Sequence, residues 1–150
     1  MLFWLSVVSA VLIAVLCWTL YNRVAASRID ALADKRRPTS RMVSSGEFFD
    51  GSRHLKVALA LTGTDLFYEN ADMEASLDLR WIREIEYDTQ LSTGHAVEGG
   101  KVLRIRCFSQ LFEFVLPNEV VPRWHMMLPP RRDPDLARAA TLVTPVPVAT

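Results

Sequence analysis

Residues 102–117 read VLRIRCFSQLFEFVLP, and apolar residues recur in this stretch at every second position. Arg104, Arg106 and Glu113 fill alternate positions. An apolar period of two predicts strands with one buried face, and Ser109-Gln110 between the two runs predicts a hairpin turn. The residues expected to face the core are Leu103, Ile105, Cys107, Phe112, Phe114 and Leu116.

The same period recurs upstream, in LALTGTDLFYEN (59–70) and SLDLRWIREIEY (76–87). Residues 55–61 and 66–68 alternate around a turn at 62–65, which predicts a second hairpin. Short strands are expected at 75–79 and 85–91. Because Ile82 and Ile85 lie three positions apart, a bulge or helical turn is expected near Trp81.

The last predicted element is one amphipathic helix over residues 118–128. Asn118 is a suitable cap, Pro122 is tolerated in a first turn, and Trp124 lies on the apolar face. Six or so short antiparallel strands followed by one helix predict a mainly β (α+β) fold. We expect a split barrel capped by the C-terminal helix.

This order of parts resembles the pleckstrin-homology (PH)-like superfold, and more particularly its GRAM and bacterial PH groups. The stretches quoted above and the helix with Trp124 carry the resemblance, which covers roughly residues 48–128. It is a likeness of pattern and order. It implies a stable scaffold that binds lipids or other proteins, and in which catalysis is rare.

The chain opens with MLFWLSVVSAVLIAVLCWTLYNRVAASR (1–28), in which Arg23 is the first basic residue. A helix over residues 2–21 spans about 30 Å, the thickness of a bilayer's hydrocarbon core. A cleaved signal peptide requires a basic residue before its apolar run, and no Lys or Arg stands there in this chain. We therefore expect a permanent transmembrane helix at 1–21. Residues 2–21 then contact the lipid bilayer.

Residues 22–41 hold six basic and two acidic residues, and basic residues beside a membrane helix stay on the cytoplasmic side. The expected location is therefore the cell inner (plasma) membrane, with the N-terminus outside and the C-terminal domain cytoplasmic. Residues 22–41 are predicted to form a basic juxtamembrane stalk. Its cluster Lys35, Arg36 and Arg37 either sets the topology alone or also contacts anionic lipid.

The remaining residues divide into a PH-like domain at 42–128 and a tail at 129–150. The tail holds five of the eight prolines in the chain, so it is predicted to be mostly disordered. The histidines, His54, His95 and His125, lie in three separate segments, and no Gly-x-Ser-x-Gly motif occurs. We therefore expect no metal site, no cofactor and no enzymatic activity.

Charge limits the possible ligands of the domain. Residues 42–128 contain eight basic and thirteen acidic side chains, a net charge of −5, which disfavours nucleic acid. PH domains that bind phosphoinositides gather basic residues around their first hairpin, but residues 62–69 contain none. Lys101, Arg104 and Arg106 are candidates for a patch that holds an anionic ligand or a partner. Alternatively, the two arginines pair across the sheet with carboxylates such as Glu113.

Outward apolar residues provide a candidate surface for a protein partner. They are Phe67, Trp81, Leu111 and Val115, unless the segment around Phe48-Phe49 or the C-terminal helix covers them. The expected function is a single-pass, membrane-anchored PH-like interaction module, an accessory subunit that binds a membrane-associated protein. The alternative is a lipid- or phosphoinositide-binding module.

Overall fold

The structure, a computed structural model, describes residues 2–51 and 53–132, and the hairpin expected from residues 102–117 is present in it. Strand β6 (Gly100–Cys107) pairs antiparallel with β7 (Gln110–Pro117). The turn lies one residue earlier than expected, at Phe108-Ser109. Leu103, Ile105 and Phe114 are fully buried, so the alternation predicted the buried face correctly.

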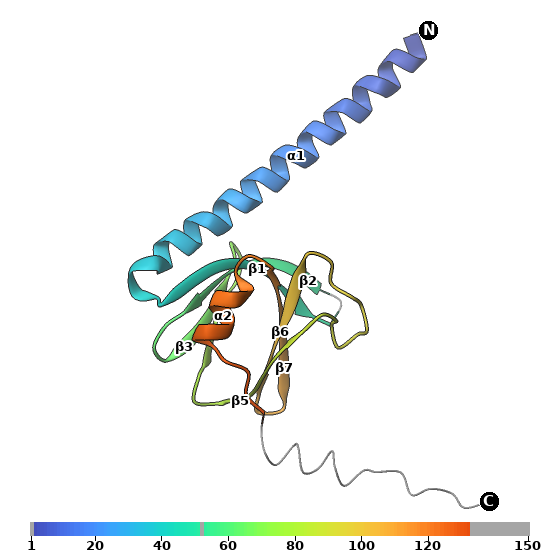
Figure 1. Ribbon diagram of the computed structural model, residues 1–150. Helices are drawn as coiled ribbons and strands as arrows, with labels where there is room; N and C mark the ends of the chain where they lie inside the picture. The colour runs from blue at the N-terminus through green and yellow to red at the C-terminus, as the bar shows by residue number, and fades with distance from the viewer. Residues whose placement is uncertain (1, 52, 133–150) are drawn as a thin grey trace, which may run out of the picture.

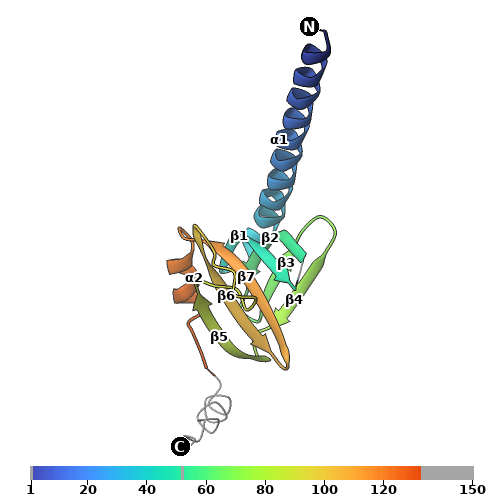
Figure 2. The same cartoon turned by 90° about the vertical axis from the view of Figure 1, so that its right-hand side faces the viewer.

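Seven antiparallel strands form one curled sheet, a half-barrel (Figures 1 and 2). The strand order is β4-β3-β2-β1-β7-β6-β5. The other strands are β1 (Met42–Asp50), β2 (Arg53–Leu61), β3 (Asp65–Glu69), β4 (Glu74–Asp78) and β5 (Ile82–Asp88). The pairing of β5 with β6 shifts register between Ile82 and Glu84, which confirms the bulge expected near Trp81. The mainly β, antiparallel character of the fold is therefore confirmed.

Strand β1 is central to the sheet, although its sequence did not predict a strand. It pairs with β2 over its whole length but with β7 only where Glu47, Phe48 and Phe49 face Val115, Phe114 and Glu113. Gly46 explains the close approach, because a Cβ there would lie 2.8 Å from Leu59 Cδ1 and 3.1 Å from the Val115 carbonyl oxygen.

The short helix α2 (Val121–Met127) carries Trp124 into the core. The Trp124 ring is fully buried, and its Nε1 donates a hydrogen bond of 2.9 Å to Ser44 Oγ on β1. Pro122 lies in the first turn as expected, but the N-cap is Val120 and not Asn118. The capping bond of an Asn is therefore absent, and packing of Trp124 supplies most of this helix's stability.

One helix, α1 (Leu2–Arg36), covers the predicted anchor and most of the predicted stalk, and most of it projects away from the sheet (Figures 1 and 2). None of the helices in the described part of the chain combines the length and apolar character needed to cross a membrane. The transmembrane helix predicted at residues 1–21 is therefore wrong. The helix continues unbroken through charged residues to Arg36, and its last turns pack on the sheet. The predicted bilayer contact rested on that transmembrane helix and is withdrawn with it. The predicted membrane location stays a prediction.

Ile29 and Ala33 join α1 to the outer face of the sheet. Both are buried against Ala58 on β2, with Leu32 and Val43 beside them. Closer to the N-terminus, the large apolar side chains of α1 that the structure describes are exposed: Val7, Val8, Val11, Leu12, Ile13, Val15, Leu16, Trp18, Leu20, Tyr21 and Val24.

After α2 the chain returns along the free edge of β5. The backbone N–H and C=O of Arg131 bond to those of Ile85 at 2.9 and 2.7 Å, and the Arg131 guanidinium donates to the Ile82 carbonyl. Residues 129–132, part of the predicted tail, are therefore packed on the sheet. Residues 133–150, the rest of the tail, lie outside the described residues.

Candidate functional site

Arg104, a candidate anion ligand, is surrounded by carboxylates on the outer face of the sheet. Its Nε lies 3.1 Å from Glu113 Oε1, and its Nη1 lies 3.2 Å from Asp88 Oδ2 and 3.4 Å from Glu86 Oε2. Its Nη2 donates to the Gln90 carbonyl at 3.0 Å. Its guanidinium donors are thus used within the protein, as the alternative interpretation anticipated.

The other two members of the predicted anionic patch do not complete a binding site with Arg104. Arg106 Nε lies 2.9 Å from Glu84 Oε2, so Arg106 is paired as well. Lys101 is exposed, but its position three residues before Arg104 points it to the opposite side of the strand. The described arrangement therefore leaves no cluster of unpaired basic side chains at this position.

Within the predicted basic cluster of the stalk, Arg36 faces the sheet. Its guanidinium forms a two-bond pair with Glu69 at 3.2 and 3.0 Å, also contacts Glu74, and lies 4.4 Å above the ring of Phe67. The hydrogen bond to Glu69 raises the pKa of Arg36, so the group stays charged. Lys35 is exposed, and Arg37, the residue after α1, pairs with Asp34 of that helix at 2.7 Å.

The predicted partner residues are spread over the molecule and do not form one patch. Phe67 is half-buried under Arg36, and Leu111 and Val115 are half-buried on β7. Trp81 is exposed and stacks on Phe108 with 5.0 Å between ring centroids. Phe108 has a φ of 55°, a left-handed conformation that is rare for a large side chain.

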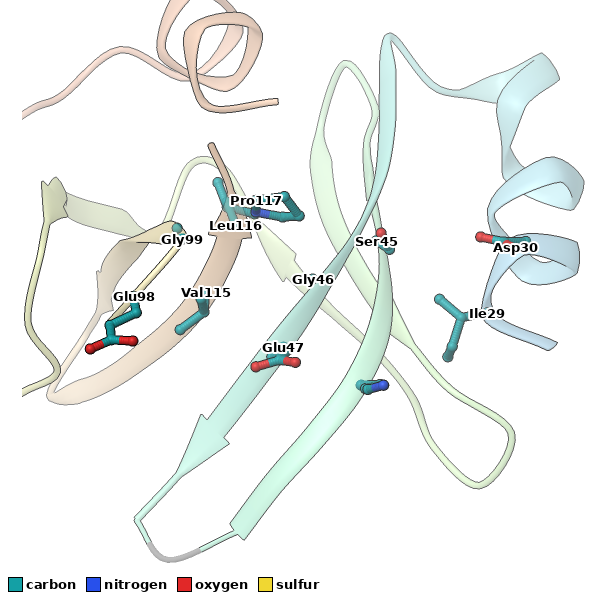
Figure 3. A pocket seen from close by; sticks show the side chains of 12 residues that line it. Ile29, Asp30, Ser45, Gly46, Glu47, Glu98, Gly99, Val115, Leu116 and Pro117 are labelled. Carbon is teal, nitrogen blue, oxygen red and sulfur yellow. The ribbon is translucent and has the colours of Figure 1, made fainter. Parts of the chain in front are cut away.

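A groove opens between α1 and the end of β7, and we call it the α1–β7 groove (Figure 3). It has a volume of about 360 Å³. Ile29 and Asp30 of α1 form one side, and Glu98 and Gly99 lie on the other, near β7. Ser45, Gly46 and Glu47 of β1 lie between the two sides. The lining is completed by Lys56 of β2, Gly100 of β6, and Val115, Leu116 and Pro117 of β7.

Packing within the fold places each side of this groove. Burial of Ile29 and Ala33 sets the position of α1, and with it Asp30. On the other side, Glu113 accepts hydrogen bonds from the backbone N–H and hydroxyl of Ser92 at 2.8 and 2.7 Å. These bonds hold the loop that leads to Glu98. Gly100 lets this loop approach β7, because a Cβ there would lie 2.6 Å from the Leu116 carbonyl oxygen.

The groove combines apolar walls with carboxylates that have no arginine partner. Ile29, Val115 and Pro117 supply apolar surface, and Asp30, Glu47 and Glu98 surround it with three carboxylates against one ammonium group, Lys56. Within the described part of the chain, no group of three or more His, Cys, Asp or Glu side chains is placed to hold a metal ion. The arrangement suits a ligand with an apolar part and a positive charge.

No protein-family model, no curated protein and no solved structure matches this chain.

Sequence reasoning found one lining residue of the groove, Val115, as an outward apolar residue. It missed Asp30, Glu47 and Glu98, because these residues come from a helix, a strand and a loop with no common spacing. Only the packing of α1 on the sheet brings Asp30 into the groove. The single local signal was Gly99-Gly100, which marks a close approach of backbones.

Proposed function

We propose that the half-barrel is PH-like and acts as a non-enzymatic module that binds another protein. One observation carries this proposal: the arginine side chains that an anionic ligand would need are already paired with carboxylates of the sheet. Arg104 and Arg106 bond to four carboxylates between them. The net charge of the groove is acidic, with three carboxylates against one ammonium group, and it favours a positively charged partner.

The topology supports the PH-like part of the proposal. A seven-stranded antiparallel half-barrel whose last helix inserts a buried Trp124 into the core agrees with the expected split barrel and capping helix. The exposed apolar part of α1 further supports a role in association, because apolar surface of this extent marks interaction sites.

The non-enzymatic part rests on the chemistry of the side chains. The most enclosed titratable groups of the sheet, Glu69 and Glu113, are held in ion pairs with Arg36 and Arg104. Burial raises the pKa values of Tyr68 and Cys107, which keeps both groups protonated and unreactive at neutral pH. No general base or activated nucleophile is among these groups.

Vesicle binding tests protein binding against the lipid alternative. The full chain is sedimented with neutral phosphatidylcholine vesicles and with vesicles that also contain phosphatidylserine or a phosphoinositide, at physiological salt. We expect the bound fraction to be the same for both kinds of vesicle and to be unchanged in Lys101→Ala. Binding that requires the anionic lipid and is reduced in Lys101→Ala or Arg106→Ala would favour a lipid reader.

Photo-cross-linking in cells supplies the positive test. A photoreactive amino acid is placed at Ser45 in the groove, at Ser109 beside Trp81 and Phe108, and at Asp72 in an exposed turn as control. We expect a discrete protein adduct from at least one of the first two sites and none from Asp72. The absence of protein adducts at both sites would contradict the proposed function.

A further inference from the structure

We propose that the α1–β7 groove binds an extended segment of a partner protein that presents a Lys or Arg side chain beside an apolar residue. This inference rests on the protein-binding function proposed above and assigns a site and a ligand chemistry to it.

The groove gathers carboxylates that have no arginine partner. On other parts of the sheet several carboxylates are neutralised by arginines, as Glu69 is by Arg36 and Glu84 is by Arg106. Among the described residues, Asp30 and Glu98 have no ion-pair partner. These two residues lie at opposite sides of the groove (Figure 3), so both sides contribute negative charge to it.

Glu47 adds a third carboxylate between these two sides. One of its oxygens lies 2.7 Å from His54 Nε2, and its second oxygen makes no hydrogen bond to another described residue. Lys56 is its cross-strand neighbour in the register of β1 and β2. Lys56 offsets only part of the negative charge, since three carboxylates line the groove with it.

The shape of the groove selects a long amphipathic side chain. About 360 Å³ is near the lower end of the range found for small-ligand pockets, roughly 300 to 1,000 Å³. The small, exposed residue Ser45 keeps the floor open, and Ile29, Val115 and Pro117 offer apolar contact. Lys and Arg have an apolar stem and a charged head, so the stem can lie on these walls while the head reaches the carboxylates.

A pair of short peptides tests this assignment. An acetylated and amidated glycine-leucine-lysine-leucine-glycine peptide is titrated into the full chain, alongside the same peptide with glutamate in place of lysine. We expect the lysine peptide to bind at least about tenfold more tightly, and its binding to weaken with added salt. Amide signals of Ser45, Gly46 and Val115 should shift during the titration.

Variants identify the charges responsible. We expect Glu47→Gln with Glu98→Gln to weaken binding of the lysine peptide by about three- to tenfold, the range for two exposed ion pairs. The matched control, Asp72→Asn with Glu119→Gln, removes the same charge outside the groove and should leave binding unchanged. Ser45→Arg, which fills the groove at an exposed position, should abolish binding.

Two results would overturn the assignment. The first is equal binding of the lysine and glutamate peptides, or an equal loss in the groove variant and its control. The second is that neither peptide binds while the cross-linker at Ser109 captures a protein. In the second case the proposed protein-binding function stands, and the groove is not its site.

Discussion

Arg36 connects the helix to the sheet through one guanidinium. Its partner Glu69 is 2% exposed, and a buried carboxylate is strongly destabilising when its cation is removed. The planar group bonds to Glu69 and lies over Phe67 at the same time. A lysine cannot reproduce this double role, because it has neither the fork of donors nor the flat face.

We therefore expect Arg36→Ala to lower the free energy of unfolding by about 2 to 4 kcal/mol, because Glu69 is left buried and charged. Adding Glu69→Gln should restore part of this loss. Urea unfolding of the wild type, both single variants and the double variant measures the coupling free energy between Arg36 and Glu69. Arg37→Ala is the matched control: its pair with Asp34 is exposed, so its cost should stay below about 1 kcal/mol. A similar cost for both arginines would contradict this account.

At the scale of elements, local alternation predicted the strands whose faces differ in polarity. The hairpin of β6 and β7 followed from residues 102–117 because every second side chain is apolar, and all of these except the half-buried Phe112 are buried. Strand β1 was missed, since Ser44, Ser45 and Gly46 interrupt this pattern. Ser44 accepts the hydrogen bond from Trp124, and Gly46 permits the close contact with β7. Trp124 and β7 are both remote from β1 in the sequence.

The contact of helix α1 with the sheet was also missed, because it too depends on residues that are remote in the sequence. Hydropathy along residues 2–21 says nothing about the last turns, where Ile29 and Ala33 pack on Ala58. The groove depends on this packing, so its carboxylates were not predictable as a site. The pairing of Arg104 with Glu113, in contrast, was available from cross-strand alternation as one of two alternatives.

The attachment of α2 yields a pH-dependent prediction. The Tyr87 hydroxyl donates to the Leu128 carbonyl at 2.9 Å, and burial raises the Tyr87 pKa above its usual value near 10. A raised folded-state pKa stabilises the fold fully below the unfolded-state pKa, and this stabilisation is lost as pH rises above it. Tyr87→Phe should cost about 1 kcal/mol at pH 8.

The difference in unfolding free energy between the wild type and Tyr87→Phe should narrow between pH 8 and about pH 10.5, because only the wild type loses this contribution once an unfolded Tyr ionises near pH 10. Urea unfolding of both proteins at the two pH values measures it. Tyr21→Phe, an exposed position on α1, should show no such change. A difference that widens with pH would contradict the prediction.

At the scale of the whole molecule, the sheet consists of two antiparallel halves, β1 to β4 and β5 to β7. Among the described residues, the two halves share backbone pairing only between β1 and β7, although core side chains such as Tyr68 and Phe114 also pack across them. Three residue pairs make this junction, and the bond from Trp124 to Ser44 adds a link at one end. The groove lies where β7 leaves β1, so the junction also sets its floor. Close packing at Gly46 therefore affects both stability and the proposed site.

Gly46→Ala should lower the free energy of unfolding by about 1 to 3 kcal/mol, the usual cost of overpacking, because the added Cβ lies 3.1 Å from the backbone oxygen of Val115. Hydrogen exchange should accelerate first at residues 47–49 and 113–115, while the hairpin of β3 and β4 keeps its protection. Gly63→Ala is the matched control, since its added Cβ lies 3.6 Å from only a flexible Arg41 side chain. If both variants are equally stable and their amides exchange alike, then core packing, which includes Trp124, and not the β1–β7 contact holds the halves together.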